Sequence, residues 1–279
     1  MAKFNCNFIS YILHRTVDIT VVVPSVTIPQ ATRRHHAADP CMHTPKENYP
    51  VLYLLHGFGN NHATWTGYTN VELYAEERQI AVVCISAENK AYITSGDDDF
   101  FRFLAEEVPD FVCGMFPISR EPQHTYIAGL SMGGFGTLVH ALSFPERFAA
   151  FGTFSAAVRL RPAGLDLDPD KAGSYNLDEA LQDDSQVQFP QFDPKMLAQK
   201  LAREGKPFPK AYISCGGADK LLKCNEQFRD MLTGMGADVT WDVIPGYGHE
   251  WRFWDIEVER FLDWLPRTDS YAKAGKRKV

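Results

Sequence analysis

Short apolar runs alternate with helical patterns along most of the chain, and this alternation constrains the fold more than any other feature. The expected buried strands are 51–55, 81–86, 125–130, 148–155, 210–215 and 239–244. Helical patterns occupy 70–79, 100–108, 132–144, 224–235 and 251–265. Strands and helices in this order predict an α/β fold with a mostly parallel central sheet flanked by helices.

Two segments at the amino terminus, 4–13 and 16–24, have the pattern of a β-hairpin at a sheet edge. From 156 to about 209 the alternation stops, and a segment rich in Asp, Pro, Gly and Gln with one helical stretch near 194–203 predicts a cap-like insertion. No linker is long or polar enough to separate two cores. The sequence therefore predicts a single domain over residues 1–279, with a basic, flexible tail at 270–279.

The charge balance and the length of the apolar runs argue against nucleic acid and membranes as partners. The chain has 28 basic and 35 acidic residues and a formal net charge of -7, so a nucleic-acid partner is not expected. No run approaches the roughly 18 apolar residues that cross a bilayer, and no membrane partner is expected either. A small-molecule substrate is expected, and a homo-oligomer is compatible with the sequence.

The cysteines and the amino terminus bear on the compartment. The six cysteines are scattered without a C-x-x-C pair, and residues 1–10 show no unbroken apolar signal segment, so we expect a cytoplasmic protein. The tract Arg33–His36, with Cys41 and His43, contains metal-ligand residue types. Its spacing fits no tetrahedral site, so no metal is expected.

The motif Gly129-Leu130-Ser131-Met132-Gly133 lies where a predicted strand ends and a predicted helix begins. In this context a G-x-S-x-G pattern indicates a nucleophile elbow, a strained turn that lifts the serine hydroxyl above the sheet. Gly129 and Gly133 are expected to leave room for the turn, because side chains there would collide with the backbone. The backbone N–H of Met132 is expected to face negative charge that develops beside Ser131.

A serine hydroxyl needs a base, normally a histidine held by a carboxylate. His249 lies on a glycine-rich loop just past the last predicted strand, and Asp219 follows the preceding strand through a Gly-Gly-Ala turn. Asp238 and Asp242 are closer to His249 in sequence but belong to the last strand, where they would point elsewhere. The order Ser131, Asp219, His249 is the order of α/β-hydrolases.

A second oxyanion donor is expected from the loop after the strand at 51–55. This loop reads His56-Gly57-Phe58-Gly59, and the N–H of Phe58 is the candidate donor. Gly57 lets the chain turn tightly enough for that amide to face Ser131. The Phe58 side chain is also expected to line the substrate pocket.

Four segments, taken together, resemble the esterase D-like branch of the α/β-hydrolases, which includes tributyrin esterases, feruloyl esterases and S-formylglutathione hydrolases. They are Leu54-Leu-His-Gly-Phe58, Gly129-Leu-Ser-Met-Gly-Gly134, Gly217-Ala-Asp219, and Gly248-His-Glu-Trp251 with Trp254-Asp255. The resemblance implies an α/β-hydrolase fold that needs no cofactor. It also implies that Ser131, Asp219 and His249 are nucleophile, acid and base, with oxyanion amides from Phe58 and Met132.

The sequence thus predicts a serine carboxylesterase that acts through an acyl-enzyme on small soluble esters, with short-chain acyl or hydroxycinnamoyl groups. Two alternatives share the same triad: an S-formylglutathione hydrolase, which cleaves a thioester, and an acyltransferase, in which an alcohol replaces water. Trp65 and Trp251 are further candidates for the pocket. In the insertion, Tyr175, Phe189 and Phe192 either shape an aromatic acid pocket or cap the core.

Overall fold

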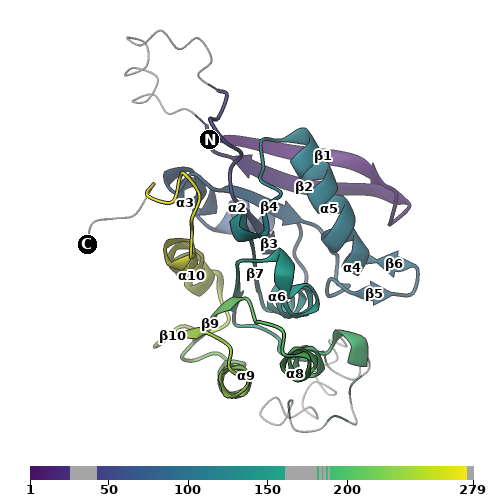
Figure 1. Ribbon diagram of the computed structural model, residues 1–279, viewed down its shortest axis with the longest axis vertical. Coiled ribbons are helices and arrows are strands. Elements are labelled where there is room, and N and C mark those ends of the chain that lie inside the picture. The colour runs from purple at the N-terminus through teal and green to yellow at the C-terminus, as the bar shows by residue number, and fades with distance from the viewer. Residues whose placement is uncertain (26–42, 161–180, 182–183, 185–186, 188, 275–279) are drawn as a thin grey trace.

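The computed structural model describes residues 1–25, 43–160, 181, 184, 187 and 189–274, and its centre is an eight-stranded sheet with the order β1-β2-β4-β3-β7-β8-β9-β10 (Figure 1). The strands are β1 (Ala2–Ser10), β2 (Arg15–Val23), β3 (Val51–Leu55), β4 (Ala81–Ile85), β7 (Thr125–Leu130), β8 (Ala150–Phe154), β9 (Lys210–Gly216) and β10 (Val239–Ile244). The pairs β1–β2 and β2–β4 are antiparallel, whereas the other pairs are parallel. The prediction of a mostly parallel sheet is confirmed.

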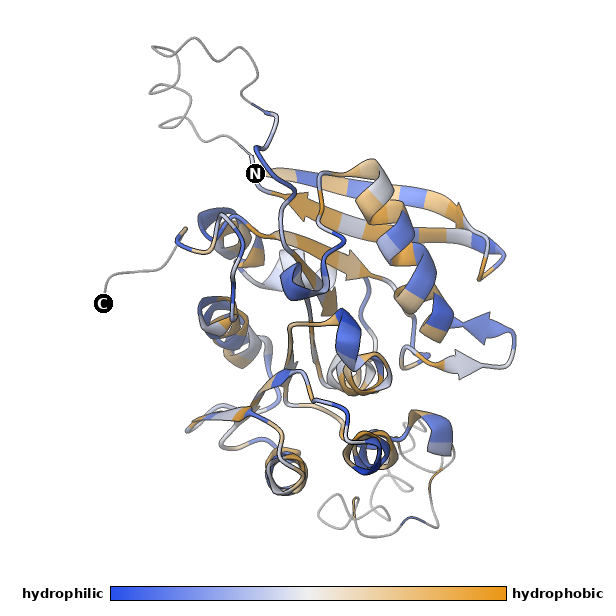
Figure 2. Cartoon of the chain, viewed as in Figure 1, coloured by the Kyte–Doolittle hydropathy of each residue, from blue (hydrophilic) through white to orange (hydrophobic). Residues whose placement is uncertain are grey.

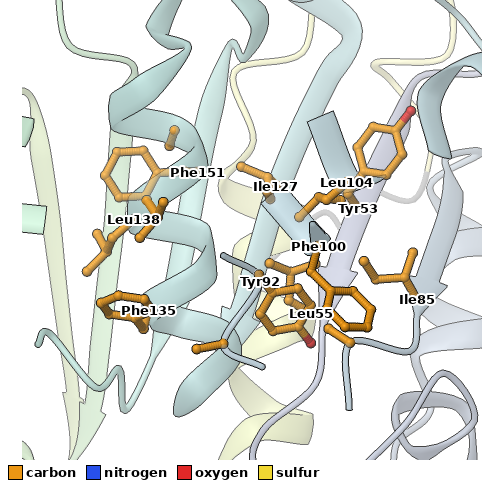
Figure 3. Close-up of a cluster of buried hydrophobic side chains, with 14 of the residues drawn as sticks. Tyr53, Leu55, Ile85, Tyr92, Phe100, Leu104, Ile127, Phe135, Leu138 and Phe151 are labelled. Atoms are coloured by element: carbon orange, nitrogen blue, oxygen red, sulfur yellow. The ribbon is translucent and has the colours of Figure 1, made fainter. Parts of the chain in front are cut away.

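The sheet separates two apolar cores, because successive side chains of each buried strand point to opposite faces. In β3, Val51, Tyr53 and Leu55 belong to one core, and Leu52 and Leu54 to the other. The first core is covered by α5 (Val108–Met115), α6 (Met132–Ser143), α8 (Pro194–Glu204) and α9 (Leu222–Gly234), and the second by α3 (Val71–Glu77) and α10 (Trp251–Trp264). Figure 2 shows these helices with a hydrophilic and a hydrophobic side, and Figure 3 shows part of the first core.

The helix predicted over 100–108 is longer and less regular than expected. It consists of α4 (Phe100–Arg102), a π-helical turn (Phe103–Glu107) and α5. Pro109 lacks the N–H that would bond the Ala105 carbonyl in a regular helix, and the Arg147 guanidinium donates to that carbonyl at 2.7 Å instead. The missing donor explains why the helix widens at this point. The short elements α2 (Thr64–Tyr68), β5 (Thr94–Ser95) and β6 (Asp98–Asp99) were not predicted.

A buried carboxylate joins this helix to the hairpin of β1 and β2. Glu107 accepts hydrogen bonds from the Ser10 hydroxyl at 2.6 Å and from the backbone amides of Tyr11 and Ile12 at 2.8 and 3.2 Å. Ser10 is the last residue of β1, and Tyr11 and Ile12 lie in the turn that follows it. Glu107 therefore fixes the edge of the sheet to the helical layer.

The structure describes the two ends of the insertion predicted at 156–209. Helix α8 agrees with the helical stretch predicted at 194–203. The guanidinium of Arg159, after β8, forms a buried ion pair at 2.7 Å with Asp193, which precedes α8. Phe192 is 9% exposed and its ring packs 5.0 Å from that of Phe101, so Phe192 caps the core. Tyr175 lies outside the described residues.

Parts of both terminal regions are also described. Tyr271, in the tail predicted to be flexible, donates its hydroxyl to the Glu47 carbonyl at 2.9 Å and packs against Tyr49. Residues 275–279 and the histidine-rich tract as far as Cys41 lie outside the described residues. Over the ranges that are described, no helix is both long and apolar enough to traverse a bilayer.

Candidate active site

The turn between β7 and α6 carries Ser131 in a strained conformation, with φ 52° and ψ -116°. The neighbouring strand β8 holds this turn. The Ser131 N–H donates to the Phe154 carbonyl at 3.0 Å, and the Ser131 carbonyl accepts from the amide of Ala157, also at 3.0 Å. The serine therefore stands just past the carboxyl end of β7, fixed by backbone contacts to the end of β8.

The glycines of the motif permit close backbone approaches. A Cβ on Gly129 would overlap the carbonyl oxygen of Gly133, and a Cβ on Gly133 would overlap that of Leu55, at the end of β3. The loop after β3 also comes close to the serine, because a Cβ on Gly57 would lie 3.5 Å from Ser131 Cβ. The overlaps at Gly129 and Gly133 agree with the steric role expected of these two glycines.

Asp219 and His249 are brought together from different loops. Nδ1 of His249 lies 2.8 Å from Oδ2 of Asp219, whose side chain is completely buried. The close approach depends on Gly216, the last residue of β9, because a Cβ there would overlap the carbonyl of Tyr247 in the histidine loop. The His249 side chain remains 38% exposed, so its ring is reachable from solvent.

The two alternative carboxylates lie elsewhere. Asp238 forms an ion pair with Lys210 at 3.3 Å, and Asp242 forms one with Arg260 at 2.7 Å. Asp242 also accepts a hydrogen bond from the Tyr212 hydroxyl. Of the three carboxylates considered from the sequence, the one in contact with the imidazole is Asp219.

Ser155 is a neighbour of this pair that the sequence analysis did not single out. Burial alone raises the pKa of Asp219, but hydrogen bonds from His249, the Leu221 amide and the Ser155 hydroxyl outweigh it and lower the pKa from its ordinary value. Ser155 is buried and has φ 51°. Ser155 follows β8, which lies between β7 and β9, the strands that lead to Ser131 and Asp219. Its place after this middle strand is the sequence feature that could have indicated a role in the site.

The loop after β3 holds the Phe58 amide in one orientation. The Gly57 carbonyl accepts hydrogen bonds from Nδ1 of His56 at 2.7 Å and from the amide of Asn60 at 3.3 Å. The peptide bond between Gly57 and Phe58 is trans, so the Phe58 N–H points away from that carbonyl. Fixing the carbonyl therefore fixes the candidate oxyanion donor.

The hydrogen bonds of His56 identify its tautomer. The Ala87 amide donates to Nε2 at 3.0 Å, so the ring proton is on Nδ1 and faces the Gly57 carbonyl. Burial lowers the pKa of His56 to about 4, which keeps the ring neutral near pH 7. The Tyr92 hydroxyl donates to the His56 carbonyl at 2.9 Å. No local sequence pattern marks His56 for this role, because two of its partners, Ala87 and Tyr92, are distant in sequence.

Aromatic rings extend from His249 to the surface. Trp254 meets the His249 ring edge-on at 4.9 Å, Trp251 lies 5.2 Å from Trp254, and Tyr68 stacks on Trp251 at 5.1 Å. Tyr68 is 64% exposed, whereas Trp65 is fully buried behind Trp251. Trp65, expected at the pocket, therefore supports the aromatic cluster from inside.

The chain is similar to known proteins in both sequence and structure. The Esterase family model matches residues 31–236. An acetyl esterase from Caldicellulosiruptor saccharolyticus is 29% identical over 273 residues, which cover 96% of this chain and 99% of the relative.

Two solved structures from Staphylococcus aureus match over nearly their whole length. FphF, a fluorophosphonate-binding serine hydrolase with substrate bound, has a TM-score of 0.77 and 27% identity, covering 95% of this chain and 98% of that one. The S-formylglutathione hydrolase FrmB has a TM-score of 0.75 and 26% identity over the same shares of the two chains. The chain described here therefore belongs to the Esterase family, has the α/β-hydrolase fold and hydrolyses carboxylic esters, as the esterase D-like resemblance of its motifs predicted.

Proposed function

We propose that Ser131, His249 and Asp219 are the nucleophile, general base and orienting acid of a serine carboxylesterase. The observation that carries this proposal is the 2.8 Å hydrogen bond between Nδ1 of His249 and the buried Asp219. With its Nδ1 proton held by the carboxylate, His249 has an unprotonated Nε2 that accepts the Ser131 hydroxyl proton. The carboxylate then stabilises the imidazolium that forms.

The reaction proceeds in two stages. Oγ of Ser131 bonds to the ester carbonyl carbon while its proton passes to Nε2 of His249, and the amides of Phe58 and Met132 donate to the resulting oxyanion. The intermediate expels the alcohol, which takes the proton from Nε2, and the acyl group remains on Ser131. A water molecule, deprotonated by Nε2, then attacks the acyl carbon. The bond from this carbon to Oγ of Ser131 breaks, Nε2 returns the proton to Oγ, and the carboxylic acid is released. Each oxyanion donor contributes about 2.7–4 kcal/mol to transition-state stabilisation.

The proposed substrates are small soluble esters with short-chain acyl or hydroxycinnamoyl groups. The acetyl esterase that matches 96% of the chain supports a short acyl group. The aromatic cluster beside His249, including the half-buried Trp251, supports an aromatic group near the site. Turnover of p-nitrophenyl acetate, tributyrin and methyl ferulate, compared as kcat/KM, distinguishes the two acyl classes.

The nucleophile is tested with Ser131→Ala. We expect kcat for p-nitrophenyl acetate to fall by about 10⁴-fold or more, since the attacking oxygen is removed. Ser143→Ala, at the other end of α6, is the matched control and should retain activity. A fluorophosphonate probe should label Ser131 in the unaltered protein. Full activity in Ser131→Ala, or a probe attached to a different residue, contradicts the proposal.

The acid is tested with Asp219→Asn, which retains a side-chain oxygen near Nδ1 but removes the charge. We expect kcat to fall by about 10³-fold or more, because the imidazolium loses its carboxylate and the ring loses its preferred tautomer. Asp242→Asn is the control, since Asp242 pairs with Arg260 instead of His249. A loss of only a few-fold in Asp219→Asn would reject Asp219 as the acid.

Hydrolysis of S-formylglutathione is a second candidate, supported by the similarity to FrmB, with its TM-score of 0.75. The same three side chains would attack a thioester carbonyl by the same steps. We expect kcat/KM to be higher for p-nitrophenyl acetate than for S-formylglutathione. The opposite order would make the thioesterase the main activity.

We also propose that the protein works in the reducing cytoplasm. The cysteines in the described ranges, Cys6, Cys84, Cys113, Cys215 and Cys224, are free thiols, which supports this compartment. Fractionation of cells that express the full chain tests it, and recovery outside the cytoplasm would refute it.

A further inference from the structure

A cavity of about 240 Å³ lies at the end of the sheet opposite Ser131. Its wall includes Tyr53 of β3 and Thr125, the first residue of β7. Ser131 follows the last residue of the same strand, so at ~3.3 Å per residue the two ends are about 20 Å apart. The cavity is therefore separate from the proposed catalytic residues. Its volume equals that of about eight liquid water molecules, which suits a small organic ligand.

The wall is mainly apolar, and its charged side chains are two cations. Its apolar part comes from both helices and strands and includes Leu104, Pro109, Ile127, Phe144 and Phe148. The charged residues of the wall are Arg120 and Arg147, and among the described lining residues none is acidic. The wall of the cavity thus carries positive charge, although the whole chain has a formal net charge of -7.

Arg147 is positioned at the cavity wall by a hydrogen bond to the carbonyl that Pro109 leaves without its helical donor. Its Nη1 donates to the freed carbonyl of Ala105 at 2.7 Å, and its guanidinium lies 4.4 Å from the centre of the Phe144 ring. No carboxylate in the described ranges lies within ion-pair distance of Arg147. Arg147 retains further N–H groups that can donate to an anion.

Arg120 has only a weak competitor. Its Nη2 lies 3.7 Å from Oδ1 of Asp110, and both side chains are exposed, at 59% and 72%. An exposed pair at this distance is screened by solvent and contributes little to stability. A ligand anion can therefore recruit Arg120 at small cost.

The inner part of the cavity is polar but uncharged. The Tyr53 hydroxyl and the Cys113 thiol form a hydrogen bond, and Cys113 Sγ also donates to the Ser119 carbonyl at 3.6 Å. Burial raises the pKa of both Tyr53 and Cys113, so both stay neutral. In Figure 3 the Tyr53 ring, with Leu104 beside it, lies apart from Leu55, whose end of β3 leads to the oxyanion loop.

We propose that this cavity binds a small apolar monocarboxylate. The carboxylate accepts hydrogen bonds from Arg120 and Arg147 at the mouth, and the apolar body packs between Leu104 and Phe148. A second negative charge would lie among uncharged groups, so a dianion is excluded. Acids of this class are also what the proposed esterase releases, but the binding claim does not depend on that activity.

Benzoate is the probe, and protection of Cys113 is the readout that locates it. In the full chain, benzoate at millimolar concentration should slow the alkylation of Cys113 by N-ethylmaleimide, measured by peptide mass spectrometry. Benzyl alcohol, which has the same ring without the charge, should protect at least tenfold less effectively. Alkylation of Cys6, outside the cavity, is the internal control.

Variants assign the protection to the cationic mouth. Arg120→Gln and Arg147→Gln should each weaken benzoate protection at least tenfold, whereas Arg203→Gln, in the last turn of α8, should not. Arg120→Gln leaves the Ala105 contact intact, so it tests charge recognition even if Arg147→Gln misfolds. It should also leave p-nitrophenyl acetate turnover unchanged. An unaltered rate at Cys113, equal protection by benzyl alcohol, or benzoate acting solely as a competitive inhibitor of the esterase would each overturn the proposal.

Discussion

Burial of the His56 ring should make the protein sensitive to acid. The pKa of this ring falls from 6.5 to about 4 on folding, mainly because burial disfavours the imidazolium. An unfolded histidine takes up a proton below about pH 6.5, whereas the folded ring resists until about pH 4. The stabilisation is therefore complete above pH 6.5 and is lost as the pH falls towards 4.

The magnitude follows from the size of the shift. A change from 6.5 to about 4 corresponds to about 3.4 kcal/mol when titration is complete, and to about 2.5 kcal/mol at about pH 4.5. His56→Asn removes the titration while keeping an N–H near the Nδ1 position for the Gly57 carbonyl. It leaves the Ala87 amide without its acceptor, which costs about 1–3 kcal/mol at every pH.

Urea unfolding at about pH 7.5 and about pH 4.5 measures both effects. We expect the unaltered protein to have a larger free energy of unfolding at the higher pH than at the lower pH. The difference in this free energy between the two proteins should change by about 2.5 kcal/mol in favour of His56→Asn when the pH is lowered. His140, whose pKa is also lowered to about 4, contributes equally to both proteins and cancels. His14→Asn, at an exposed turn with φ 52°, is the control. A difference that does not change with pH would refute the buried neutral ring.

The same side chain can be tested for its effect on the oxyanion loop. His56→Gln offers an acceptor near the Nε2 position but lacks the donor to Gly57, so it should lower kcat for p-nitrophenyl acetate more than His56→Asn does. KM should change little in either variant, because the Phe58 amide acts mainly on the transition state. If His56→Asn is the more damaged enzyme, the Ala87 contact matters more than the donor to Gly57.

Three other changes test groups that support the site or the fold. Ser155→Ala removes a donor to Asp219 and should lower kcat about tenfold with KM unchanged, whereas equal kcat would exclude a positioning role. Burial raises the pKa of Glu257 to about 7 from 4.5, so stability falls by about 3 kcal/mol as the pH rises through this interval. Glu257→Gln should therefore match the unaltered protein in Tm near pH 5 and exceed it near pH 8. Glu107→Ala should cost at least about 3 kcal/mol in urea unfolding, because it leaves buried donors unpaired, whereas Glu106→Ala, which loses only an exposed ion pair, should cost less than about 1 kcal/mol.

Much of the fold was predictable because its strands are buried on both faces and are therefore continuous apolar runs. Strands β7 and β10 have the predicted bounds, and α6 and α8 end within one residue of those predicted. The π-helical turn at Phe103–Glu107 was not predicted, although Pro109 marks it, because a proline in a helical pattern normally signals an end or a kink. Here the Arg147 side chain, distant in sequence, compensates the unpaired carbonyl and the helix continues.

The candidate site was predictable to the extent that strand order places groups at one edge of the sheet. Ser131, Asp219 and His249 each follow a strand, and parallel strands bring their carboxyl ends together. His56 and Ser155 also follow strands, but their roles depend on partners that no local pattern indicates. For His56 the partner is the backbone amide of Ala87, which leaves no trace in residue type. A side chain whose role depends on a distant backbone group, as that of His56 does, therefore cannot be recognised from a single sequence.

The strained serine turn explains why β8 matters although it contributes no residue to the proposed triad. A non-glycine residue held at φ 52° costs on the order of 1–3 kcal/mol, so it persists only where the surrounding structure imposes that conformation. The contacts of Ser131 with Phe154 and Ala157 supply that constraint, and both come from β8 and the segment that follows it. The same segment carries Ser155, which donates to Asp219. Strand β8 thus connects the nucleophile to the acid, so displacement of its carboxyl end would disturb both halves of the site together.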